Sequence, residues 1–217
     1  MTDLPETALS RSALWSAIFA ERDALAADLA GFEDWTAPSL CEGLTVREVL
    51  AHLTAGASLT FSKWMAGVVK CRFDFDKQVD MQLRRQMGAT GAETLDRFAR
   101  TATSTKHPIP VPAVLGEIVV HGEDIRRPLG IRRDHPVPVL TALAVYFQRS
   151  NMTVPSGKRA AGLRLDAADG PFAAGDGPLV TGPTLALIMA MAGRTAYLDE
   201  LGGEGAPEFC QRCTDLK

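Results

Sequence analysis

The segment Val114-Leu-Gly-Glu-Ile-Val-Val-His-Gly-Glu-Asp-Ile-Arg126 places a glutamate and a histidine in an otherwise largely apolar run. Glu117 and His121 are four positions apart, and side chains at that spacing lie one above the other on the same face of a helix. An ionised carboxylate and an imidazole facing a core are costly to desolvate without partners, and a divalent metal can serve both. A surface pair or a hydrogen-bonded core histidine fits the same pattern, so these two residues alone are a weak motif.

A third candidate ligand, His52, lies on a helix that the sequence predicts to begin after Thr45. Thr45 and Glu48 have the spacing of a capping box, which marks a helix start. His52 lies at the edge of the apolar stripe of this helix, which consists of Val46, Val49, Leu53 and Ala57. A single histidine there is more often structural, but a possible partner pair is present on another helix.

Helical periodicity predicts two further helices in the first part of the chain, at residues 7–30 and 78–103. Gly88 and Gly91 interrupt the second of these, and a capping box at Thr90 predicts a kink or a new start. Four helices joined by loops predict a helix bundle, in which side chains from facing helices can build a metal site. Two histidines and one glutamate are a ligand set that leaves a zinc ion one open coordination position.

The composition changes after Gly130, where helical periodicity gives way to short strand patterns. A linker at residues 135–138 precedes an amphipathic helix at residues 139–149. Strand patterns then follow, separated by turn residues, and a last helix begins with the Gly182-Pro183 pair; the strands are expected at residues 162–166, 171–174 and 179–181. The chain is therefore expected to be mainly α-helical, with a metal-binding bundle at residues 1–133 and a small α/β domain at residues 134–217.

Composition and charge narrow the classes of partner. The 217 residues are 46% hydrophobic, enough for a packed core, and the net charge of −3 argues against nucleic acid and anionic membranes as partners. The longest apolar run, residues 185–192, is too short to cross a bilayer, and no signal segment is recognised, so a cytoplasmic protein acting on small molecules is expected. Four cysteines do not make a disulfide framework in a chain of this size. Both a monomer and a homodimer are compatible with the sequence.

Two segments carry a recognisable pattern: Pro38-Ser-Leu-Cys-Glu-Gly-Leu-Thr-Val-Arg-Glu-Val-Leu-Ala-His52 and Gly116-Glu-Ile-Val-Val-His-Gly-Glu-Asp124. They resemble the N-terminal half of the mycothiol-dependent maleylpyruvate isomerases, which belong to the DinB-like superfamily of metal-binding four-helix bundles. The resemblance implies a zinc ion held by His52, Glu117 and His121. Leu44 departs from the pattern, because many relatives have tryptophan there. The segments at residues 177–183 and 192–194 resemble the small α/β C-terminal domain of the same family.

The resemblance also implies a reaction. Mycothiol would bind the open zinc position as a thiolate and add to a small unsaturated acid, giving an isomerase, or an S-transferase if the thioether is the product. A metal-dependent hydrolase and a non-catalytic metal- or thiol-binding protein are the alternatives. An anionic substrate calls for a cationic side chain, and the candidates are Arg84, Arg85 and Arg194.

Three further features carry weaker expectations. Cys210-x-x-Cys213 has metal or redox spacing but lacks a second pair, so it is interpreted as a loose tail with two free thiols. Cys41 has no histidine beside it in the sequence, as a catalytic thiol would need, although a histidine could approach it in space. Asp124 is one turn beyond His121 and could accept a hydrogen bond from its ring, although a nearby arginine is the more common partner of such a residue.

Overall fold

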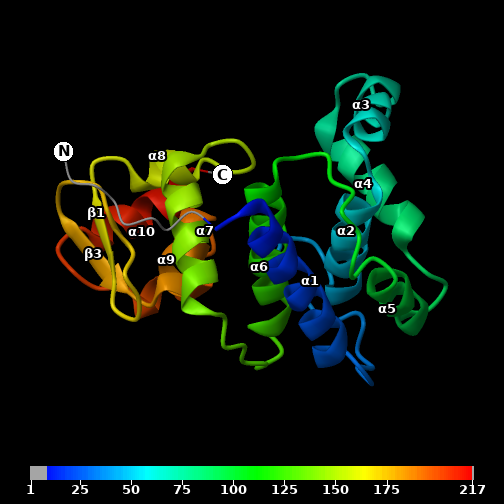
Figure 1. Cartoon of the computed structure of the whole chain (residues 1–217), viewed down its shortest axis with the longest axis horizontal. Coiled ribbons are helices and arrows are strands. Elements are labelled where there is room, and N and C mark those ends of the chain that lie inside the picture. Colours follow the sequence, from blue (N-terminus) through cyan, green and yellow to red (C-terminus); the bar gives the residue numbers. More distant parts are fainter. Residues whose placement is uncertain (1–8, 217) are drawn as a thin grey trace. The chain divides into compact units, whose positions relative to one another are not determined.

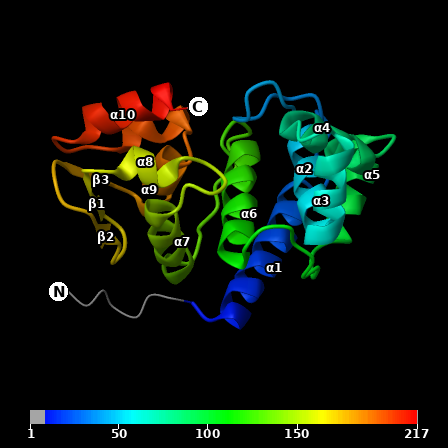
Figure 2. The same cartoon turned by 90° about the horizontal axis from the view of Figure 1, so that it is seen from above.

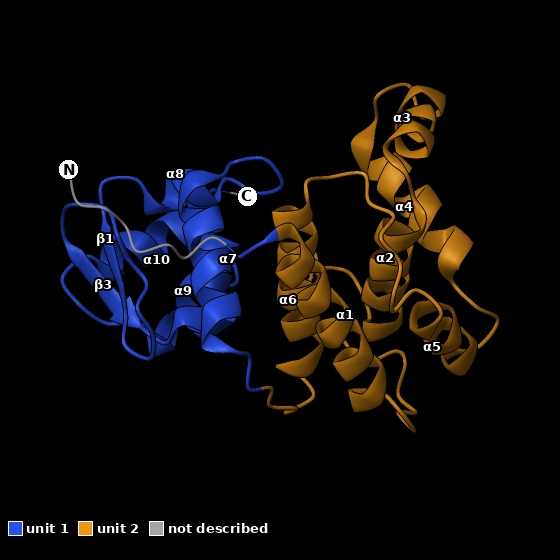
Figure 3. Ribbon diagram, in the orientation of Figure 1, with its two compact units in different colours: residues 1–10, 134–217 blue, residues 11–133 orange. Residues whose placement is uncertain are grey.

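The computed structural model of the protein describes residues 9–216. The chain divides into two compact units, one formed by residues 11–133 and the other by residues 1–10 and 134–217 (Figure 3). The candidate metal ligands all belong to the unit of residues 11–133.

Six helices form the unit of residues 11–133, all of which the structure describes. They are α1 (Arg11–Asp28), α2 (Val46–Ser58), α3 (Phe61–Lys70), α4 (Phe75–Gln86), α5 (Gly91–Ala99) and α6 (Val111–Arg126). Helix α1 lies along α6, and α2 packs against α4, α5 and α6 (Figures 1 and 2). The core between α1, α2 and α6 is apolar and buried; it includes Ile18, Leu25, Leu50, Leu115 and Ile118. Helix α2 is therefore held beside α6, which carries the Glu117 and His121 pair.

The start of α2 confirms the predicted capping box. The Thr45 hydroxyl accepts a hydrogen bond from the backbone N–H of Glu48, and the Glu48 carboxylate accepts one from the backbone N–H of Thr45 at 2.9 Å. These two bonds satisfy backbone donors that a helix start otherwise leaves unpaired. The predicted apolar stripe of α2 is buried as well. The register of α2, and with it the direction of His52, follows from this local chemistry.

The number of helices differs from the prediction. The new start predicted at Thr90 within residues 78–103 is confirmed and divides this segment into two helices, α4 and α5, whereas α3 was not predicted at all. The new start at α5 follows from Thr90, whose hydroxyl accepts a hydrogen bond from the Glu93 N–H at 3.1 Å. Gly91 begins α5 directly against the ring of Trp35, where a side chain would clash. The predicted first helix begins at Arg11, and Thr7, where it was expected to start, lies outside the described residues.

The other unit is a small α/β structure. Its elements are α7 (Val137–Arg149), α8 (Ser156–Ala160), β1 (Arg164–Ala167), β2 (Ala173–Ala174), β3 (Leu179–Gly182), α9 (Thr184–Met191), the 3-10 helix η1 (Thr195–Glu200) and α10 (Ala206–Asp215). In the described part of this unit the strand order is β2-β1-β3, with β1 antiparallel to β2 and parallel to β3. Helix α9 packs against this sheet and against α7. The predicted fold class, mainly helical with a small sheet in the second part of the chain, is confirmed.

The expectation of a loose tail around Cys210 and Cys213 is wrong. Both residues lie on α10, whose Phe209 and Cys213 side chains are buried one turn apart. The Cys213 thiol donates a hydrogen bond to the Ala190 carbonyl at 3.0 Å, and burial raises its pKa to about 12. All four cysteines are free thiols. Cys213 therefore acts as a small core residue and not as a reactive thiol.

Within the described residues, no helix is both long and apolar enough to cross a membrane.

Candidate metal centre

The three predicted ligands lie together in the structure. Glu117 Oε2 is 3.2 Å from His52 Nε2 and 3.4 Å from His121 Nε2. His52 comes from α2, while Glu117 and His121 are one turn apart on α6. One ligand atom from each residue lies within 4.8 Å of the other two. The packing of α2 on α6 thus brings two histidines and a glutamate to one point.

These separations fit a divalent metal of the zinc type. An ion that binds nitrogen and oxygen at about 2.0–2.1 Å in tetrahedral geometry separates its ligand atoms by roughly 3.3–3.4 Å. The two printed separations from Glu117 Oε2, 3.2 and 3.4 Å, are close to that edge length. The side chains of His52 and Glu117 are 29% and 31% exposed, so the group is reachable from solvent. The donor set and its spacing fit a three-ligand site with one coordination position open.

The neighbouring side chains favour the charged forms of Glu117 and His121. Burial raises the pKa of the Glu117 carboxyl, but hydrogen bonds and charges of His121 and His52 outweigh it and hold that pKa below its ordinary value. Burial lowers the pKa of His121, but hydrogen bonds to its neighbours, Asp124 first among them, raise it well above 6.5. A metal at this position must displace the proton from the coordinating nitrogen. Metal binding and protonation of His121 are therefore competing reactions.

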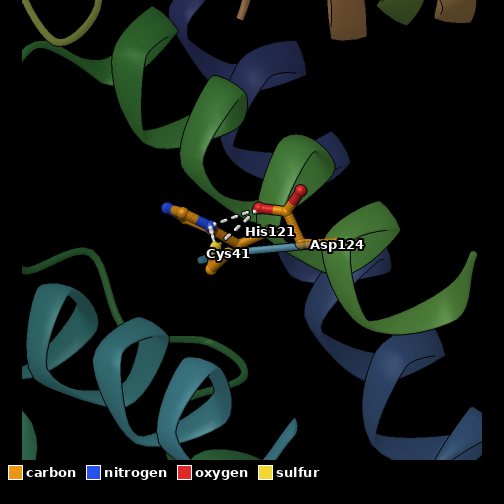
Figure 4. Close-up of side chains that lie close together, drawn as sticks. All are labelled: Cys41, His121 and Asp124. Carbon is orange, nitrogen blue, oxygen red and sulfur yellow. Dashed lines mark hydrogen bonds and ion pairs between the residues drawn. The ribbon is translucent and has the colours of Figure 1, made fainter. Parts of the chain in front are cut away.

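The other nitrogen of the His121 ring faces a second pair of side chains, Asp124 and Cys41. Asp124 Oδ2 lies 2.8 Å from His121 Nδ1, and its side chain is completely buried. Cys41 Sγ lies 3.4 Å from the same Nδ1 and donates a hydrogen bond to Asp124 Oδ2 at 3.0 Å (Figure 4). A proton on Nδ1 is thus directed to a carboxylate, while Nε2 points toward Glu117. Of the two partners considered for Asp124, His121 or a nearby arginine, the structure shows the hydrogen bond to His121.

Cys41 is a member of this cluster that the sequence patterns did not predict. It lies in the loop before α2, 80 residues from His121 along the chain. No motif links the two residues, because the approach arises from the packing of this loop on α6. The one local signal is position: the loop that ends in the capping box must pass close to the helix against which α2 packs.

The candidate arginines are not among the residues of the cluster. Arg84 is exposed on α4 and pairs with Asp80 one turn away, Nε to Oδ2, at 2.8 Å. Arg85 is exposed on the same helix. Arg194 belongs to the other unit, where its guanidinium donates to the Ala192 carbonyl at 2.8 Å. Arg84 thus forms a solvated surface pair, which is the usual state of an arginine on a helix.

Comparison with known proteins gives a family match and two similar structures. Residues 15–110 match the model of a family described as the mycothiol maleylpyruvate isomerase N-terminal domain. This range contains His52 and ends just before α6. No match was found among curated proteins.

The two similar structures are crystal structures of the mycothiol-dependent maleylpyruvate isomerase, one of them a histidine-to-alanine mutant. The mutant has 13% sequence identity to this chain and a TM-score of 0.63. The other structure has 14% sequence identity and a TM-score of 0.59. Each comparison covers 91% of this chain and 94% of the isomerase chain. At identities this low, the structural similarity shows a shared fold alone, and the matched residues include both units. Residues 15–110 are therefore similar to the mycothiol maleylpyruvate isomerase N-terminal domain, and the chain shares the fold of the mycothiol-dependent maleylpyruvate isomerase structures.

Proposed function

We propose that this protein is an enzyme that uses mycothiol and a divalent metal, preferably zinc, to isomerise a small unsaturated acid of the maleylpyruvate type. The single observation that carries the proposal is the group of His52, Glu117 and His121 at separations suited to a tetrahedral metal. The family match over residues 15–110 supports mycothiol as the thiol. The similar isomerase structures support the same reaction class.

His52 and His121 would hold the metal through Nε2, and Glu117 through its carboxylate. When bound, the metal would supply an open position at which a thiol loses its proton near neutral pH. The Glu117 carboxylate would offset part of the metal charge, since it is held ionised by its neighbours. His52 comes from a different helix, so the ligand set is complete only while α2 packs on α6.

The proposed reaction consumes no thiol. The thiolate adds to one carbon of the double bond, and the electron pair of that bond moves onto the conjugated carbonyl group of the acid. The resulting single bond rotates, and return of the electron pair expels the thiolate and restores the double bond in the other geometry. If the adduct accepts a proton and is released, the product is a thioether and the activity is S-transfer. The same ligand set serves both outcomes, and product analysis distinguishes them.

The carboxylate of the substrate needs a cationic partner in the active protein. The candidates are Arg84, Arg85 and Arg194. Arg84→Ala, Arg85→Ala and Arg194→Ala should be compared for a rise in KM with a smaller change in kcat. An arginine whose removal changes neither constant is excluded from substrate binding.

The experiment that tests the proposal has two parts. Elemental analysis of the purified protein should find about one zinc per chain, and mycothiol titrated into this form should bind. His52→Ala should lose metal and thiol binding together, because three ligands are the minimum for the open site. His107→Ala is the matched control: His107 lies outside the cluster, with its ring 5.5 Å from that of Trp15.

Full thiol-dependent activity in the metal-free His52→Ala protein would overturn the proposal. Tight zinc binding with no measurable binding of mycothiol to the native protein would instead favour the hydrolase or a non-catalytic metal-binding protein.

A further inference from the structure

The two nitrogens of the His121 ring face different partners. A neutral imidazole carries one proton, so the nitrogen that binds a metal must be the one without it. Nε2 of His121 points toward Glu117, and Nδ1 lies 2.8 Å from Asp124 Oδ2. The Asp124 carboxylate therefore favours the tautomer with its proton on Nδ1. Such outer partners orient metal-binding histidines and raise their affinity for the metal.

Asp124 is itself oriented by the Cys41 thiol. Its side chain is completely buried, and a buried carboxylate needs hydrogen-bond donors to offset desolvation. Cys41 Sγ donates to Oδ2 at 3.0 Å, and Oδ2 is also the oxygen that faces His121. The thiol and the imidazole thus meet at one oxygen atom. Cys41 Sγ also lies 3.4 Å from Nδ1, so it limits rotation of the ring toward that side.

The loop before α2 holds the thiol in this position. The Leu40 N–H donates to the backbone carbonyl of Asp124 at 2.9 Å, which ties the loop to α6. Within the loop, the Cys41 N–H donates to the Ser39 hydroxyl at 3.1 Å, and that hydroxyl donates to the Leu44 carbonyl at 2.8 Å. The Leu44 N–H in turn donates to the Cys41 carbonyl at 3.0 Å. The backbone on both sides of Cys41 is therefore anchored.

We propose that Cys41 is a positioning residue of the metal centre: together with Asp124 it holds the His121 ring in the tautomer and orientation that direct Nε2 to the metal. The inference rests on the proposed metal-dependent function and adds to it a role for a thiol that does not itself bind the metal. The two contacts of Cys41, to Asp124 and to Nδ1, lie on the side of the ring opposite Nε2.

The first test compares zinc affinity by competition with a chromogenic chelator. Cys41→Ala should weaken zinc binding by about tenfold, at the lower end of the 10–100-fold effect of outer partners, because a thiol is a weak donor. Cys41→Ser keeps a donor for Asp124 and should recover most of the affinity. Cys210→Ala removes a half-buried thiol from α10 and is the matched control, with unchanged affinity. Equal affinity in all four proteins would overturn the inference.

A second test replaces zinc with cobalt and records the visible spectrum of the bound metal. A general loss of protein stability would not produce the same spectral change. The visible bands of the cobalt-loaded protein should shift in Cys41→Ala and return toward the native pattern in Cys41→Ser. Without added thiol, the native protein should show no thiolate-to-cobalt charge-transfer band. Such a band in the native protein that disappears in Cys41→Ala would make Cys41 a metal ligand and contradict the positioning role.

A metal-free measurement keeps this inference separate from the proposed function. If the native protein binds no metal, the proposed function fails, and the exchange of the His121 Nδ1 proton with water still tests Cys41 by NMR. Exchange should be slow in the native protein and in Cys41→Ser, and faster in Cys41→Ala. Identical exchange in the three proteins would contradict the role of Cys41.

Discussion

His52 Nε2 lies 3.2 Å from Glu117 Oε2, although the two residues are 65 positions apart in the sequence and belong to different helices. Glu117 Oε2 is also 3.4 Å from His121 Nε2, so one oxygen atom connects both histidines. Replacement of Glu117 should therefore affect the whole ligand set.

Glu117→Gln should reduce zinc affinity by more than the roughly 100-fold that loss of an outer partner can cause. The amide is uncharged and cannot offset the charge of the metal or of a protonated His121. Glu204→Gln, at an exposed glutamate in the other unit, is the control for a lost carboxylate. Competition with a chelator measures both variants. Native affinity in Glu117→Gln would remove this residue from the ligand set.

The stability of the metal-free protein should depend on pH through His121. Its pKa is raised well above 6.5 in the folded protein, so its stabilising contribution is fully present below 6.5 and is lost as pH rises through the folded pKa. The native protein should thus have a larger free energy of unfolding than His121→Gln, and this difference should be greater at about pH 6 than at about pH 10. Denaturant titrations at several pH values measure the difference, and a difference that does not change with pH would contradict the assignment.

Glu117 should make the stability of the metal-free protein depend on pH in the opposite direction. Its pKa is lowered from 4.5, so its stabilising contribution is present above 4.5 and is lost as pH falls through the folded pKa.

Zinc affinity should rise with pH over the range in which His121 loses its proton, because metal and proton compete for Nε2. Zinc affinity that falls with rising pH over this range would argue against His121 as a ligand.

The buried Arg126 connects α6 to α1 and should be important for stability. Its side chain is fully buried, with Nε 2.7 Å from Asp28 Oδ2, and it lies within ion-pair distance of Glu21 and Glu123. Arg126→Ala leaves buried carboxylates without this partner and should destabilise the protein by about 3–5 kcal/mol. Arg84→Ala removes an exposed pair and should leave stability unchanged. Thermal and denaturant unfolding measure both, and equal effects would contradict the difference in burial.

Replacement of either of two helical glycines with alanine should change the stability of the protein, but in opposite directions. A Cβ at Gly91 would lie 2.0 Å from Trp35 Cγ, so Gly91→Ala forces the ring or the helix to move and should cost about 1–3 kcal/mol. A Cβ at Gly56, exposed on α2, meets nothing within 4 Å. Gly56→Ala should stabilise the protein by about 0.5–1 kcal/mol, because alanine is the better helix former. Unfolding midpoints measure both changes, and stabilisation by Gly91→Ala would contradict the close packing of Trp35.

Local chemistry explains which parts of the fold could be predicted from the sequence. The capping box at Thr45 and the four-residue spacing of Glu117 and His121 are short-range patterns, and the structure contains both. The approach of Cys41 to His121 depends on the folding of a loop onto a helix 80 residues away, and no short-range pattern encodes it. Helix α10 was missed because its apolar face is short: Phe209 and Cys213 are its buried residues.

The central claim is that a thiol binds a metal held by His52, Glu117 and His121. X-ray absorption at the zinc edge, recorded on the zinc-loaded protein before and after addition of mycothiol, tests it most directly. Before addition, the account predicts nitrogen and oxygen ligands and no sulfur, since Cys41 lies on the other side of the His121 ring. After addition, a single sulfur should appear at about 2.3 Å. Sulfur before addition, or none after it, would contradict the account.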